Sequence, residues 1–262
     1  IFFHPIVTSA VNLNLGAIAL DKALLQKGLT NETRKDHLRA ATVYLHRALN
    51  RADYKSVQRR LGIAYFSEGD VEAAIRHWQH DPQAVEFLLT QGESLLAQGD
   101  EENALRMWEL ALRVDPSAPS PHWRIAQFYE ERGDKARALE RYCQAIALGS
   151  TRIVDRQDEH DRKVLTDSYL RAGVILAEEE RWDEAIELYR EGLKLFPDDG
   201  GLHVALGQAI YEAYEDAEGA EAEMQKAVIL EGDGIGPRLA LSNLYRQEKR
   251  YEEAAEQARE CL

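Results

Sequence analysis

An alanine recurs along this chain at an almost constant interval. A bulky side chain follows most of these alanines by four residues, as in the pairs Ala74–Trp78, Ala104–Trp108 and Ala138–Tyr142. Residues four apart share one helix face, and periods of roughly 20–50 residues are typical of repeat architectures. The interval therefore predicts similar helical units that bury a core only when they stack. The alanines are Ala41, Ala74, Ala104, Ala138, Ala185, Ala220 and Ala254, with separations of 33, 30, 34, 47, 35 and 34 residues.

Turn and stop residues subdivide each interval. Glycine ends a helix well because it adopts the left-handed conformation freely, and the aspartate after it caps the next helix. Proline ends a helix because it lacks the amide proton and clashes with the preceding turn. Each unit is therefore predicted to be two antiparallel helices joined by a short turn. The Gly-Asp turns are at 69–70, 99–100 and 133–134, and the prolines are Pro82, Pro116 and Pro197.

These elements resemble the tetratricopeptide repeat, whose unit is about 34 residues long. The resemblance lies in Leu61-Gly62 and Tyr65 of the first helix, the Gly-Asp turn, and Ala104, Trp108, Ala111 and Pro116 of the second helix and its stop. It covers roughly residues 9–262. The resemblance implies an all-α fold, a right-handed α-solenoid of about seven stacked helix-turn-helix units.

The match divides the chain into three stretches. Residues 1–54 are expected to form an irregular N-terminal unit with inserted residues. Residues 55–199 form the regular array, with an insertion at about 150–163, and residues 200–262 form C-terminal units of which the last is truncated. The carboxylates of the insertion alternate with arginine and lysine, which favours a solvated helical extension over a cation site.

The sequence HWQHDP, residues 77–82, raises the question of a metal site. His77 and His80 are three residues apart, so they share a helix face. Trp78 between them occupies the aromatic position of a second helix, and Pro82 arrives early. We therefore interpret the segment as the end of a shortened helix whose histidines are solvated or half-buried, and we expect no metal and no cofactor.

Function is expected on the first helices, which line the concave groove in proteins of this family. The resemblance places groove residues at the second, fifth, ninth, twelfth and thirteenth positions of a unit. The chaperone-tail-binding subgroup needs lysine and asparagine at the fifth and ninth positions, and this chain lacks that pair, so capture of an acidic C-terminal tail is not predicted. The candidate groove residues are Arg59, Glu93, Trp123, Gln127, Glu130, Gln208 and Tyr211.

The leading hypothesis is a non-catalytic scaffold that binds a peptide or protein segment in this groove. The alternative is an interaction or regulatory region of a larger membrane protein or enzyme. The formal net charge of −14 argues against nucleic-acid binding, which rests on a basic surface. We further expect a soluble chain, with a cytoplasmic location favoured over an extracytoplasmic one, and self-association through uncapped ends.

Overall fold

The computed structural model describes residues 5–49, 54–153, 159–232 and 234–260. Within these ranges the chain forms fourteen α-helices and no strand, which confirms the predicted all-α class. The helices are α1 (Pro5–Leu25), α2 (Asn31–Ala48), α3 (Tyr54–Glu68), α4 (Val71–Trp78), α5 (Ala84–Ala97), α6 (Glu101–Val114), α7 (Pro119–Glu130), α8 (Lys135–Ile153), α9 (Glu159–Glu178), α10 (Trp182–Leu195), α11 (Gly200–Tyr214), α12 (Ala217–Glu231), α13 (Ile235–Gln247) and α14 (Tyr251–Arg259).

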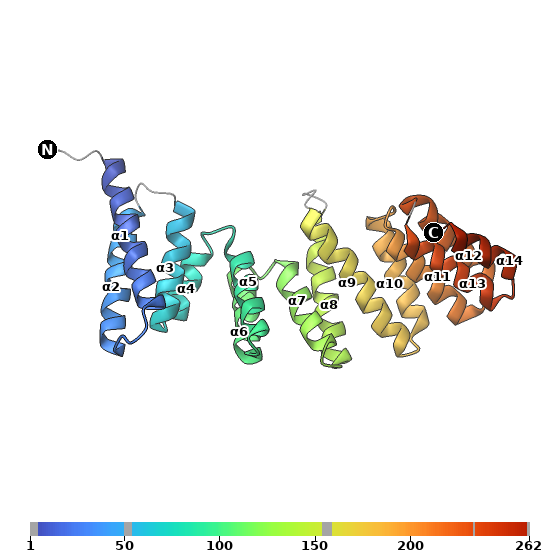
Figure 1. The fold of residues 1–262 in the computed structure, drawn as a ribbon, viewed down its shortest axis with the longest axis horizontal. Helices are drawn as coiled ribbons and strands as arrows, with labels where there is room; N and C mark the ends of the chain where they lie inside the picture. The colour runs from blue at the N-terminus through green and yellow to red at the C-terminus, as the bar shows by residue number, and fades with distance from the viewer. Residues whose placement is uncertain (1–4, 50–53, 154–158, 233, 261–262) are drawn as a thin grey trace. The chain divides into compact units, whose positions relative to one another are not determined.

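The helices form consecutive antiparallel pairs within two compact units (Figure 1). In the first unit, residues 1–116, α1 packs on α2, α3 on α4 and α5 on α6. In the second unit, residues 117–262, the pairs are α7–α8, α9–α10, α11–α12 and α13–α14. The division into an irregular stretch (1–54), a regular array (55–199) and C-terminal units (200–262) remains a prediction.

The Gly-Asp turns have the predicted geometry. Gly69, Gly99 and Gly133 have φ values of 89°, 82° and 74°, in the left-handed region. Asp100 then accepts a hydrogen bond from the backbone amide of Asn103 at 3.3 Å, and the amide of Asp100 closes the turn onto the carbonyl of Leu95 at 2.9 Å. These bonds satisfy backbone groups that helix ends leave unpaired.

Later repeats make similar left-handed turns without glycine. Glu180, Glu215 and Lys249 have φ values of 60°, 53° and 63°. A side chain in this region costs free energy that glycine avoids, so the fold imposes the turn on residues that do not favour it. Sequence patterns alone did not indicate these turns.

A glycine of the first helix and a tryptophan of the second helix bring the two helices of a unit into close contact. A Cβ atom at Gly62 would lie 2.2 Å from the indole nitrogen of Trp78, and one at Gly92 would lie 2.2 Å from that of Trp108. Both tryptophans are about 1% exposed. At both positions the indole of the second helix fills the space that a Cβ atom would need, so a larger residue would clash with that tryptophan.

Proline shortens one helix, as predicted. Helix α4 has 8 residues and ends at Trp78, whereas α6 and α10 have 14 each. The chain turns at Asp81 and Pro82 and starts α5 at Ala84. This early stop accounts for the short interval of 30 residues between Ala74 and Ala104.

The insertion lengthens the helices on either side of it. Helix α8 continues to Ile153, and α9 starts at Glu159. Asp155 and Asp158, which belong to the predicted extension, lie outside the described residues. Asp161 departs from the expected solvated extension, since it is 9% exposed and lies on the buried face of α9 with Val164 and Leu165.

In the part of the chain that the structure describes, none of the helices combines the length and the hydropathy that crossing a membrane requires.

Candidate groove on the first helices of the second unit

Three predicted groove residues on α7 meet α9 in a polar network. The indole N–H of Trp123 donates to Oδ2 of Asp167 at 2.5 Å, and Nε2 of Gln127 donates to the same oxygen at 3.5 Å. Trp123 is half-buried and also packs against the hydrophobic core of this unit. Its polar edge is therefore already paired within the chain.

Glu130 extends this network to the second helix of its own repeat. Its carboxylate accepts a hydrogen bond from Arg171 Nη1 at 3.2 Å and from the Tyr142 hydroxyl at 2.6 Å. Burial, together with the bond to Glu130, raises the pKa of Tyr142 well above its ordinary value. The hydroxyl therefore stays protonated and donates to the carboxylate.

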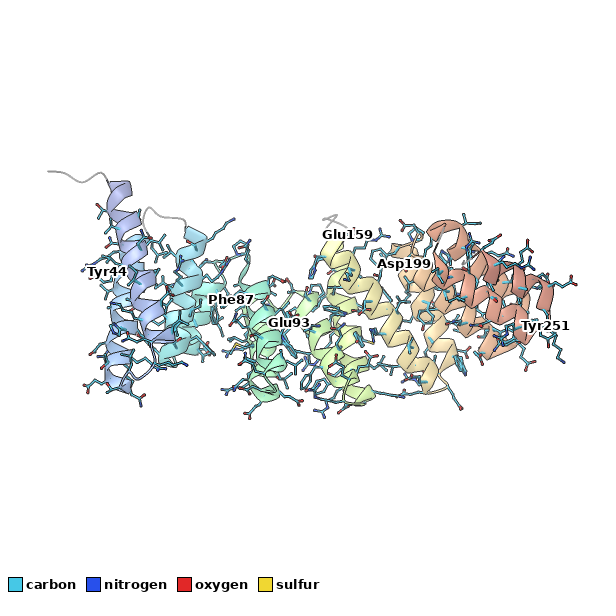
Figure 2. All side chains as sticks on the ribbon, viewed as in Figure 1. Tyr44, Phe87, Glu93, Glu159, Asp199 and Tyr251 are labelled. Atoms are coloured by element: carbon cyan, nitrogen blue, oxygen red, sulfur yellow. The ribbon has the colours of Figure 1, made fainter. Side chains whose placement is uncertain are left out.

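Arg59 and Glu93 belong to the first unit. Nε of Arg59 donates to Oδ2 of Asp81 at 2.6 Å, and Nη2 donates to Oδ1 at 3.1 Å. A third bond, at 2.8 Å, joins Nη2 to the side-chain oxygen of Gln83. A partner of Arg59 would have to compete with this ion pair. Glu93 is exposed on α5 (Figure 2).

Gln208 and Tyr211 line a groove on the first helices of the second unit. Two adjoining pockets of about 480 Å³ each make up this surface, which we call the α9–α11–α13 groove. They share Ala205, Gln208, Ala240 and Asn243, so the pockets are continuous. The first pocket is lined by Val174, Ala177, Glu178, Trp182, Tyr189, Ala205, Gln208, Ala209, Tyr211, Glu212, Met224, Ala240, Asn243, Leu244 and Gln247. The second adds Leu170, Gly201, Val204, Glu231, Gly236, Pro237 and Leu239.

The groove combines a small-residue floor with amide groups. Ala177, Ala209 and Ala240 come from three different first helices and leave room between them. The amides of Gln208 and Asn243 are exposed, and within the described residues they make no hydrogen bond to the rest of the chain. A carboxamide offers donors and an acceptor together. The groove therefore presents unpaired hydrogen-bonding groups above an apolar floor.

The repeat positions that line the groove in this family include further residues of this chain that were not among the candidate groove residues. The thirteenth positions of three successive units are Glu178, Glu212 and Gln247, and all three line the first pocket. The second position of the α9 unit is Asp167, which binds Trp123. Position within the repeat was the signal that identifies these four residues.

The histidines of HWQHDP lie in a side-chain cluster of the first unit. The His77 ring stacks on Tyr65 at a centroid distance of 5.2 Å, and its Nδ1 lies 2.6 Å from Oε1 of Gln58. His80 is exposed. Among the described residues, no group of three or more histidine, cysteine, aspartate or glutamate side chains is arranged to hold a metal ion.

We predict that His77 makes the first unit less stable in acid. Burial, and then the charges of His46, Arg76 and His80, lower the pKa of His77 from 6.5 to about 4. Between these values the unfolded chain takes up a proton that the folded chain does not, so stability present above pH 6.5 is lost as the pH falls toward 4. Allowing for partial exposure, the loss is about 1 kcal/mol at pH 5.

Thermal unfolding at pH 7 and pH 5 measures this contribution. The variant His77→Gln should lose less stability on acidification than the unaltered chain. The variant His37→Gln, on α2 and outside the charges that act on His77, is the control, and it should retain the full pH dependence. Identical pH dependence of His77→Gln and the unaltered chain would contradict the prediction.

Family models and one curated protein match parts of this chain. Models of the tetratricopeptide repeat match residues 89–152 and residues 166–209. Human Protein O-mannosyl-transferase TMTC1 is 25% identical over 222 residues, which are 82% of this chain and 24% of that protein. The chain therefore spans about a quarter of the length of this relative.

Solved structures show the same fold at low identity. Residues 41 to the end of MamA from Desulfovibrio magneticus RS-1 align with a TM-score of 0.51 and 21% identity, over 68% of this chain and 92% of that one. Pseudomonas aeruginosa PilF aligns with a TM-score of 0.53 and 22% identity, over 68% and 75%. The Cut9–Hcn1 hetero-tetramer of the APC/C aligns with a TM-score of 0.52 and 16% identity, over 98% and 51%.

The antiparallel helix pairs, the repeat matches in both units and these structural neighbours lead to one assignment. This chain is a tetratricopeptide repeat protein.

Proposed function

We propose that the chain is a non-catalytic scaffold that binds an extended protein or peptide segment in the α9–α11–α13 groove. The main observation in support is that two adjoining pockets share the side chains of Gln208 and Asn243, whose amides are unpaired within the described residues. An extended segment has regularly spaced backbone N–H and C=O groups, and the carboxamides can pair with both. The tetratricopeptide fold supports a protein-interaction scaffold in general, and one structural neighbour is a complex of Cut9 with Hcn1.

The remaining candidate residues extend the proposal beyond the pockets. Trp123, Gln127 and Glu130 would contact a longer segment along α7, where their partners on α9 hold them in place. Arg59 and Glu93 would form a separate contact surface of the first unit. Aromatic and arginine side chains are the commonest anchors of protein interfaces.

The variant Gln208→Ala/Asn243→Ala is expected to bind a groove ligand at least about fivefold more weakly, because two hydrogen bonds contribute about 1–3 kcal/mol together. Ligands would be selected from a displayed library of random 12-residue peptides, synthesised, and titrated by fluorescence anisotropy. Gln144→Ala/Gln225→Ala is the control, because it removes two amides from the second helices α8 and α12. Equal affinities for all three proteins would place the binding site elsewhere.

A second candidate is that the chain serves as the interaction region of a larger enzyme or membrane-tethered protein. The similarity to human Protein O-mannosyl-transferase TMTC1 favours it, since that protein is about four times as long as the matched part. In this candidate the chain binds and the rest of the parent protein carries out the chemistry. Mannosyl transfer by this chain alone would contradict the non-catalytic role.

We also propose that exposed apolar side chains in the first repeat and near the last repeat associate with a second copy of the chain. Ile229 and Tyr251 near the last repeat are 80% and 65% exposed, and Leu25 in the first repeat is 75% exposed. Exposed large apolar side chains of this kind favour association. A monomeric mass by light scattering at high protein concentration would contradict this.

A further inference from the structure

The first pocket of the α9–α11–α13 groove lies where three first helices end. Glu178 is the last residue of α9, Gln247 is the last residue of α13, and Glu212 is two residues before the end of α11. All three line the pocket. The C-terminal turn of a helix carries a partial negative charge, since its last carbonyls lack partners inside the helix. Three such ends around one pocket favour a bound cation.

The side chains of the pocket have the same sign of charge. Its lining contains the two carboxylates of Glu178 and Glu212 and no lysine, arginine or histidine. Glu178 pairs with Lys135 at 2.9 Å, but both side chains are about half exposed, so solvent weakens this pair. Among the described residues, Glu212 forms no ion pair. The chain therefore leaves negative charge at the pocket uncompensated.

Aromatic rings and an apolar floor complete the pocket. Trp182 and Tyr211 both line it, and aromatic faces attract cations within about 6 Å. The Tyr211 hydroxyl donates to Glu248 at 2.7 Å, which joins α11 to the residue that follows α13. Met224 and Leu244 contribute apolar surface. Lysine and arginine have an apolar stem and a charged end, and such a side chain requires both kinds of lining.

We infer that the first pocket of the groove receives a lysine or arginine side chain of the bound segment. This inference rests on the proposed function, because it names the side chain that the groove selects. The stem lies against the apolar floor, and the cationic end lies beside Glu178 and Glu212 at the three helix ends. The whole chain has a formal net charge of −14, and this acidic surface also favours a basic partner.

The peptides selected for the groove provide the test. They should contain a lysine or arginine, and replacing it with norleucine, which keeps the stem and removes the charge, should weaken binding at least about tenfold. The variant Glu178→Lys/Glu212→Lys should weaken binding by a similar factor. Changing the basic residue of the peptide to glutamate should restore part of the affinity for this variant only.

Two further variants make the result specific. Glu140→Lys/Glu256→Lys makes the same change in net charge at exposed positions of α8 and α14, and it should bind like the unaltered chain. Glu212→Lys alone breaks no ion pair within the described residues, so it tests the charge even if the double variant loses stability. Glu212→Lys should lower the affinity for the basic peptide and leave the affinity for the norleucine peptide unchanged.

The outcomes separate this inference from the proposed function. One outcome would be peptides that bind Gln208→Ala/Asn243→Ala more weakly but whose affinity changes neither with norleucine nor with the lysine variants. This outcome would overturn the inference that the first pocket receives a basic side chain, and it would still support binding in the groove. Selected peptides that prefer apolar or acidic residues in place of lysine or arginine would also overturn this inference and still support binding in the groove. A screen that yields no peptide dependent on Gln208 and Asn243 would overturn both.

Discussion

Replacing Arg59 with methionine is expected to destabilise the first unit by about 3 kcal/mol, because the change strands a buried carboxylate. The side chain of Asp81 is 0% exposed, and Arg59 is 29% exposed. Arg59 contacts both carboxylate oxygens, and the backbone amide of Gln83 supplies one further bond at 3.1 Å. Without the guanidinium, the bond from the Gln83 amide is the one hydrogen bond left within the described residues for a carboxylate that is buried in the folded unit. The estimate is at the low end for buried pairs because Arg59 is partly exposed.

The double variant Arg59→Met/Asp81→Asn distinguishes a stranded charge from lost packing. Asparagine has nearly the same shape as aspartate and no charge, so the double variant should recover more than half of the loss. Thermal and urea unfolding of the unaltered chain, the single variant and the double variant would measure this. Equal losses for the single and double variants would show that Arg59 stabilises the unit through its contacts rather than by neutralising Asp81.

Replacing Gly92 with alanine is expected to cost about 1–3 kcal/mol, although alanine favours helices in general. The new Cβ would lie 2.2 Å from Nε1 and 2.6 Å from Cδ1 of Trp108. Trp108 is held in place, since its indole N–H donates to the carbonyl of Leu89 at 3.2 Å and its side chain is about 1% exposed. Relief of the clash would therefore require α5 and α6 to separate.

A double-mutant cycle with Trp108→Leu tests this explanation. A smaller side chain leaves room for the Cβ, so Gly92→Ala should cost much less in the Trp108→Leu background than in the unaltered chain. Ser94→Ala, at an exposed position on the same helix, is the control and should change stability by less than about 0.5 kcal/mol. Equal costs of Gly92→Ala in both backgrounds would exclude Trp108 as the cause.

Residues close together in the sequence determined the helices and turns. The helix period, the left-handed glycines and the proline stops act over a few residues, so they predicted the helix pairs and the short α4. The spacing of Gly92 and Trp108 is equally local, because both belong to one helix pair. The turns at Glu180 and Lys249 escaped prediction, since packing of the flanking helices imposes a conformation that neither residue favours.

Only the tertiary structure decided which groove side chains remain available to a partner. Position in the repeat selected Trp123 and Gln208 alike, but Trp123 binds Asp167, 44 residues further on, whereas the amide of Gln208 has no partner within the described residues. The α9–α11–α13 groove likewise exists because alanines from three helices meet. A repeat pattern describes each unit by itself, and the pairing of a polar side chain depends on which residues neighbouring units place beside it.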